Sequence, residues 1–151
     1  MNTFLTISKE LFEQGKSVRF EARGWSMRPL IRDGDFVIAR PIDSTSVKIG
    51  DIVFYITDNN GILVHRIIGL RRDDGEMTAM IKGDACFGPP DNVPVQNIFG
   101  RVVSIERKGR EKRFDTAWQR ALSLILVAAA PLTLWGLPIL SRAKRMLLSG
   151  R

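Results

Sequence analysis

The chain has 151 residues, of which 44% are hydrophobic and 26% charged, a composition that fits one domain with its own core and excludes a disordered polar chain. The net charge of +7 suits nucleic acid or the anionic surface of a membrane. A single cysteine, Cys86, excludes an internal disulfide, and a single histidine, His65, argues against a structural zinc site.

The first expected element is an amphipathic helix over Thr3–Gln14, which Gly15 ends. Its apolar face is expected to consist of Phe4, Leu5, Ile7, Leu11 and Phe12. Charged side chains are spread along this helix, so we do not expect it to be a secretory signal peptide.

Short strands follow at close spacing, with no helix between them. They are expected at residues 17–22, 35–42, 48–57, 62–72, 77–84 and 98–107. The turn signals are "DNNG" at Asp58–Gly61 and "DDGE" at Asp73–Glu76, and residues 86–95 read as a Gly/Pro loop. The pattern predicts a mostly β domain, a small twisted antiparallel sheet folded onto itself.

The C-terminal part changes character. "ALSLILVAAAPLTLWGLPIL" is a run of 20 residues without a charge, about the ~20 needed for a helix that spans a bilayer. Trp118 and Trp135 lie near its ends, as interfacial aromatics do, whereas Pro131 and Pro138 favour a kink. We expect a membrane-spanning or re-entrant segment; a buried helix or helical hairpin of a soluble protein is the alternative. The expected divisions are a β-domain at 1–106 (core 22–105), a basic linker at 107–120, the hydrophobic segment at 121–140 and a basic tail at 141–151.

A serine and the histidine are candidates for nucleophilic catalysis. Ser26 lies in the turn "GWSMRP", and a serine in such a turn is ordinarily a turn residue only. It becomes a nucleophile if a base takes its proton, and a neutral imidazole does so near pH 7. The 39 positions between Ser26 and His65 mean that only the fold can join them. A histidine that is simply packed and hydrogen-bonded is the alternative.

Two loop acids complete the candidate site. A carboxylate on the far ring nitrogen would orient the imidazole of His65, and Asp84 and Asp91 are the candidates, although acids in such loops are commonly turn formers. The backbone amide of Ser26 would face a developing oxyanion. Lys48 and Lys82 are weaker candidates for the base.

Several motifs occur in order: "GWSMRPLIRDGDFVIARP", "VKIGDIVFY", "LVHRIIGL", "IKGDA" and "PPDNVPVQNIFGRVVSI". Together they resemble the catalytic core of type I signal peptidases over about residues 22–105. The resemblance implies the coiled antiparallel β-sheet domain of that family, with Ser26 as the nucleophile.

The resemblance also concerns the base. In the bacterial branch a lysine stands where this chain has His65, whereas the endoplasmic-reticulum and archaeal branch uses a serine, a histidine and a nearby aspartate. Asp84 and Asp91 match the two acidic positions of that branch, and a loop one residue longer leaves open which acid meets His65. Imidazole is neutral at pH 7 without deep burial, so we expect a less buried base than a catalytic lysine would be.

The sequence is therefore interpreted as a membrane-associated serine endopeptidase that cleaves precursor proteins near a hydrophobic segment through a Ser26 acyl-enzyme. Small residues before the cut would occupy a shallow apolar cleft lined by residues 20–25 and 81–87. The expected partners are a protein precursor and a membrane, and we expect no cofactor or metal. We also expect no nucleic acid, because the basic linker lacks interleaved aromatics. The oligomeric state stays open.

Two alternatives remain: a non-catalytic, membrane-anchored peptide-binding β-domain, and a self-cleaving regulatory peptidase like those of SOS-type repressors. We expect the protein at the plasma membrane, held by a single C-terminal segment. Basic residues before and after that segment would put the catalytic domain on the cytoplasmic side, opposite to a signal peptidase. A re-entrant segment, an unusual substrate or a misleading charge bias would each reconcile this orientation with a signal-peptidase-like activity.

Overall fold

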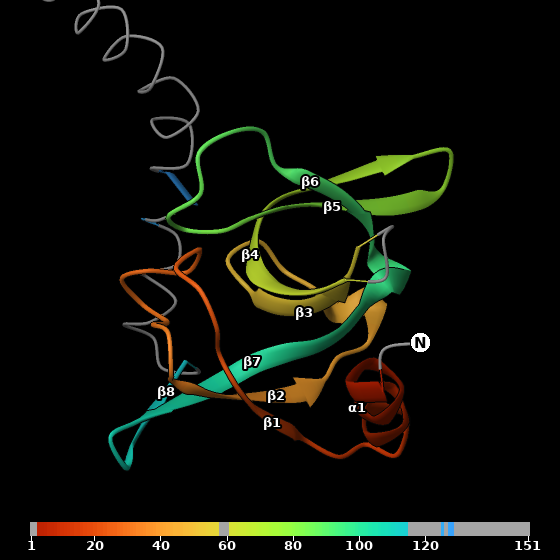
Figure 1. The fold of residues 1–151 in the computed structure, drawn as a ribbon. Coiled ribbons are helices and arrows are strands. Elements are labelled where there is room, and N and C mark those ends of the chain that lie inside the picture. Colours follow the sequence, from red (N-terminus) through yellow and green to blue (C-terminus); the bar gives the residue numbers. More distant parts are fainter. Residues whose placement is uncertain (1–2, 58–60, 115–124, 126, 129–151) are drawn as a thin grey trace, which may run out of the picture.

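The computed structural model describes residues 3–57, 61–114, 125, 127 and 128. It is mostly β, with one short helix at the N-terminal end (Figure 1). The elements are α1 (Thr3–Glu13), β1 (Val18–Glu21), β2 (Phe36–Pro41), η1 (Ser44–Ser46), β3 (Ile52–Ile56), β4 (Ile62–Asp73), β5 (Glu76–Lys82), β6 (Asp91–Pro94), η2 (Val95–Asn97), β7 (Ile98–Arg107) and β8 (Arg110–Arg113).

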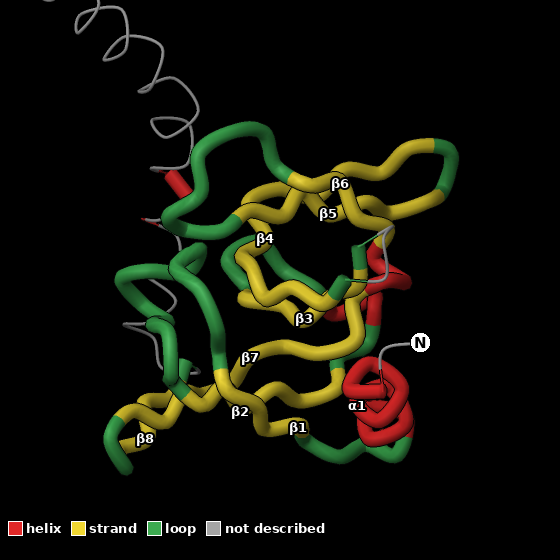
Figure 2. The backbone as a smooth tube through the Cα atoms, viewed as in Figure 1, coloured by secondary structure: helices red, strands yellow, loops and turns green. Residues whose placement is uncertain are grey.

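The strands form one antiparallel sheet in the order β1-β2-β7-β3-β4-β5-β6, and β8 pairs antiparallel with the end of β7. The sheet curls like half a barrel, so that β1, β2 and β7 lie at the bottom of Figure 1 and β5 and β6 at the top. The predicted antiparallel β-domain is confirmed. Long loops gather on one side of the curl, where the loop before β2 comes near the loop after β5 (Figure 2).

β3 lies in the middle of the sheet, and all five of its residues are buried. Its side chains enter different parts of the core, because neighbours on a strand point to opposite faces. Tyr55 joins the cluster under β4 and β5, whereas Phe54 packs beneath α1. The rings of Phe54 and Phe12 meet edge to face, with centroids 5.4 Å apart. α1 is thereby fixed against the sheet.

The sheet also extends into segments that the sequence left without strands. Asp91–Pro94 forms β6 inside the expected Gly/Pro loop; its Pro94 is tolerated because β6 is the last strand in the sheet order. Arg110–Arg113 forms β8 inside the expected basic linker. In α1, Ile7 of the expected apolar face is 50% exposed and Ser8 is buried, because only one side of the helix contacts the sheet.

Within the part of the chain that the structure describes, no helix has the length and apolar character needed to cross a membrane. The expected hydrophobic segment lies outside the described residues except for three of its positions, 125, 127 and 128. The basic tail at 141–151 and residues 58–60 of the expected "DNNG" turn lie outside them too.

Candidate active site

Ser26 lies on the loop that joins β1 to β2, and this loop is held by apolar packing and by a backbone hydrogen bond between its two ends. Buried Met27, Leu30 and Ile31 pack it onto the core. The amide of Ala22 donates to the carbonyl of Asp35 at 2.7 Å, which closes the loop where the two strands meet.

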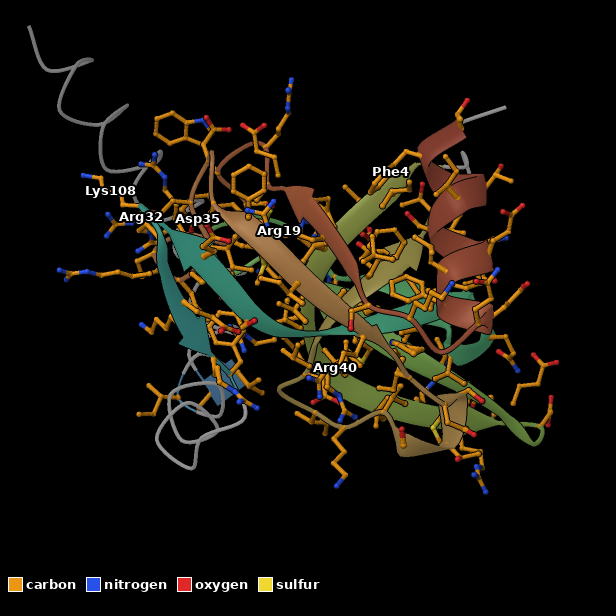
Figure 3. All side chains as sticks on the ribbon, turned by 90° about the horizontal axis from the view of Figure 1, so that it is seen from below. Phe4, Arg19, Arg32, Asp35, Arg40 and Lys108 are labelled. Atoms are coloured by element: carbon orange, nitrogen blue, oxygen red, sulfur yellow. The ribbon has the colours of Figure 1, made fainter. Side chains whose placement is uncertain are left out.

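An ion pair holds the same loop from the side. The carboxylate of Asp35 is almost fully buried and accepts two hydrogen bonds from the Arg107 guanidinium, at 2.7 and 2.6 Å. The backbone amide of Arg32 donates to it as well, at 2.7 Å. Figure 3 shows Arg32 and Asp35 together at the end of the sheet where Lys108 also lies. The Arg107 bonds, with the Arg32 amide, hold the pKa of Asp35 below its ordinary value although burial opposes them.

The fold brings Ser26 and His65 together. His65 lies on β4 opposite Val53 of β3, and its Nε2 atom is 3.0 Å from Ser26 Oγ. His65 is only 8% exposed, so the expectation of a less buried base is wrong. Burial is also the main reason why the pKa of His65 lies below its ordinary value, a shift that the nearby carboxylates of Asp91 and Asp84 oppose. The imidazole is therefore neutral at pH 7.

Tyr55 occupies the far side of the imidazole. Its hydroxyl oxygen is 3.0 Å from Nδ1 of His65 and donates a hydrogen bond to Oδ2 of Asp91 at 2.8 Å. Burial, followed by the contact with Asp91, raises the pKa of Tyr55 far above its ordinary value, so the phenol keeps its proton. Asp91 thus reaches His65 through Tyr55 and not by direct contact.

Asp84 has a different partner. Its two carboxylate oxygens accept from Nε and Nη2 of Arg66, both at 2.7 Å. The side chains are 0% exposed for Arg66 and 3% for Asp84, and Arg66 also donates to the carbonyl of Gly50 at 3.0 Å. Because Arg66 follows His65 on β4, this ion pair ties the loop after β5 to the strand that carries the histidine.

The loop after β5 also touches the serine directly. The amide of Ala85 donates to the carbonyl of Ser26 at 2.8 Å. A Cβ atom on Gly83 would lie 2.6 Å from the sulfur of Cys86 and 2.8 Å from the Ser26 carbonyl oxygen. Only glycine fits this contact between the two loops.

A cleft of about 340 Å³ opens beside the two side chains, and Ser26 and His65 both line it. One wall runs from Phe20 to Gly24 and the other from Ile62 to His65. Phe4 of α1 contributes as well and lies on the sheet side of its helix (Figure 3). The first wall agrees with the sequence expectation; the second replaces residues 81–87, none of which lines this cleft among the described residues.

The comparison with protein families finds a match. The model described as Peptidase S24-like matches residues 2–85, more than half of the chain. The chain belongs to the S24-like peptidase family. Membership implies a serine-type peptidase, of the kind that includes SOS-type repressors and signal peptidases. A search of curated proteins gave no match.

The S24-like match covers Ser26, His65 and Asp84 and ends before Asp91. Among the predicted site residues, Ser26 contacts His65 directly, and Asp91 is linked to His65 through Tyr55. Asp84 instead forms an ion pair with Arg66. Sequence reasoning missed Tyr55. The expected hairpin could have revealed it. In its register Val53 lies opposite His65, so Tyr55, two residues further along β3, is on the same face of the sheet as His65.

Proposed function

We propose that this S24-like peptidase is a membrane-associated serine endopeptidase that cleaves precursor proteins, with Ser26 as nucleophile and His65 as general base. The observation that supports this most is the 3.0 Å separation of Ser26 Oγ and His65 Nε2, within the reach required for proton transfer. A relic pair in a binding domain has no need of that distance. The position of the base beside the serine favours His65 over Lys82 and Lys48.

In the proposed reaction, Ser26 Oγ attacks the scissile carbonyl carbon while its proton passes to Nε2 of His65. The backbone amide of Ser26 stabilises the oxyanion. The carbon–nitrogen bond then breaks, and His65 gives its proton to the leaving amine. Water attacks the acyl-enzyme with His65 again accepting a proton, and that proton returns to Ser26 when the ester breaks.

The walls of the cleft suit an extended peptide. β1 is the first strand in the sheet order, and residues 62–65 of β4 lie beyond the start of the pairing with β5. Each wall therefore offers backbone groups to which a substrate strand can add. Val37, Met27 and Ile31 contribute apolar atoms to a lining that also includes Glu21 and Arg32, and the volume of about 340 Å³ has room for substrate side chains. The proposal of small residues before the cut rests on the resemblance to signal peptidases.

Association with a membrane is proposed on two grounds. The sequence carries the uncharged segment at 121–140 with basic residues on both sides. Trp25 and Phe87, each 64% exposed, belong to the two loops that meet at Ser26, where a membrane-embedded substrate would approach. Exposed aromatics of this kind suit the interface between lipid and water.

The test is cleavage of a panel of precursors in membranes from cells that make the wild type, Ser26→Ala or His65→Ala. Ser17→Ala, at an exposed serine that does not line the cleft, is the matched control. We expect wild type and the control to trim the same precursor. His65→Ala should lose about 10²- to 10⁴-fold in rate, and Ser26→Ala should lose more because it has no nucleophile, while both accumulate as folded protein. A near-normal rate for His65→Ala would place the base elsewhere. Binding of precursors without any cleavage by wild type would favour the peptide-binding domain.

Self-cleavage is a second candidate, favoured by the family match, because the SOS-type repressors share this kind of domain. The intact mass of the purified chain distinguishes it. A wild-type chain that shortens with time while Ser26→Ala stays whole would support self-cleavage, and a stable wild type that cuts added precursors would exclude it.

A further inference from the structure

The hydroxyl of Tyr55 lies between Nδ1 of His65 and the carboxylate of Asp91. The protons available to these three groups determine which of them donates and which accepts. An ionised carboxylate only accepts hydrogen bonds, so the single phenolic proton of Tyr55 must point to Asp91, 2.8 Å away. The Tyr55 oxygen is then left to accept from Nδ1 of His65, at 3.0 Å. That places the imidazole proton on Nδ1 and leaves the lone pair of Nε2 facing Ser26.

We propose that Tyr55 is a positioning residue that sets the tautomer of His65, and that it transmits the negative charge of Asp91 to the imidazole as a neutral link. The inference rests on the proposed role of His65 as the base. In the opposite tautomer, Nε2 would carry a proton and could not accept the one from Ser26. Tyr55 therefore keeps His65 ready for the first step of the reaction.

The neutral link has a second consequence. A carboxylate in direct contact would stabilise the imidazolium strongly and raise the pKa of the base. Here Tyr55 stands between, fully buried at 0% exposure, and the other groups that face it are Asp91 from β6 and Cys86 from the loop after β5. Asp84, which also acts on His65, is itself paired with Arg66. The Nδ1–H of His65 keeps Tyr55 as its acceptor both while the imidazole is neutral and when it becomes charged.

Tautomer and charge can be observed without any substrate, because His65 is the only histidine of the chain. Heteronuclear NMR of the full-length protein carrying isotope-labelled histidine reports the two ring nitrogens separately. We expect the wild type to carry its proton on Nδ1 at neutral pH. In Tyr55→Phe, which keeps the ring and removes the hydroxyl, we expect a mixture of tautomers and an imidazole that protonates only at lower pH.

The same variants have kinetic signatures. Tyr55→Phe should lower kcat by roughly 10²-fold, a part of what a general base contributes, with little change in KM, and should move the acid limb of the rate profile to lower pH. Asp91→Ala should act in the same direction, with Asn92→Ala as its neighbouring control. Because both residues act through one chain of hydrogen bonds, Tyr55→Phe/Asp91→Ala should be no slower than Tyr55→Phe alone.

Each result decides the proposal. A wild-type proton on Nε2, an unchanged tautomer in Tyr55→Phe, or additive effects in the double variant would each overturn it. Should Tyr55→Phe fail to fold, the wild-type tautomer and the response to Asp91→Ala, an exposed position, give the answer. Failure of the proposed function looks different: Ser26→Ala would then cleave like the wild type, while the tautomer of His65 remained as described.

Discussion

Gly83 is the position where the smallest change should have the largest effect on the site. Replacing it with alanine adds one carbon atom, which would lie 2.8 Å from the backbone oxygen of Ser26 and 3.0 Å from its Cβ. Ordinary contact begins at 3.4 Å, so the two loops must separate by about 0.6 Å. The oxygen belongs to backbone and cannot rotate away, so we expect the loop of Ser26 to shift relative to His65.

The magnitude follows from the geometry. Ser26 Oγ and His65 Nε2 are 3.0 Å apart, and a further separation of about 0.6 Å would take them beyond hydrogen-bond distance. Since a displacement of about 1 Å can cost about 10²-fold, we expect Gly83→Ala to cleave about 10-fold more slowly or worse. Overpacking should also lower the free energy of unfolding by about 1–3 kcal/mol.

Gly69→Ala is the matched control, because its new Cβ would meet only the flexible side chain of Met80, at 3.1 Å or more. Precursor cleavage gives the rate, and urea unfolding of the full-length chain gives the stability. Equal rates for Gly83→Ala and Gly69→Ala would refute the argument that the Gly83 contact positions the serine.

Two further predictions concern the ion pairs. Arg66→Met should lower the free energy of unfolding by about 3–5 kcal/mol, because it leaves the Asp84 carboxylate buried without its partner, and Arg66→Met/Asp84→Leu should recover most of that loss; a single variant as stable as wild type by urea unfolding would contradict this. Asp35→Asn should cost about 1–3 kcal/mol at pH 7. Because the pKa of Asp35 is lower in the folded state, its contribution to stability is present above about pH 3.9 and is lost as the pH falls through the folded pKa. The difference in free energy of unfolding between wild type and variant, measured by urea unfolding at several pH values, should therefore shrink on acidification. A difference that grows would contradict this.

The sheet was largely predictable from the sequence, because its strands obey local rules. Alternation at Val18–Glu21 and the Asp73–Glu76 turn are readable one segment at a time; Asp74 and Gly75 do adopt the positive φ that such a turn requires. β6 and β8 were missed for the same reason. Prolines and runs of charged residues argue against a strand locally, whereas the free edge of β5 and the part of β7 beyond its pairing with β3 supply the hydrogen bonds that form β6 and β8.

The site was predictable only in part. Ser26 and His65 were candidates by chemical type, but their contact depends on how far the sheet curls, and no local pattern encodes that. The role of Asp84 was harder to predict, because an acid in a loop reads alike whether it faces a histidine or an arginine. What distinguishes the two is that Arg66 is completely buried, and a buried guanidinium requires a carboxylate.

The two ion pairs explain how loops can hold a reactive pair of side chains in place. Asp35–Arg107 fastens the loop of Ser26 to β7, and Arg66–Asp84 fastens the loop that touches Ser26 to the strand of His65. Apolar side chains of the same size would give as much stability or more, but they fix no direction. A guanidinium that meets a carboxylate with two hydrogen bonds fixes both distance and orientation. These two directional ion pairs therefore lie where a shift of a few tenths of an ångström would separate Ser26 from His65.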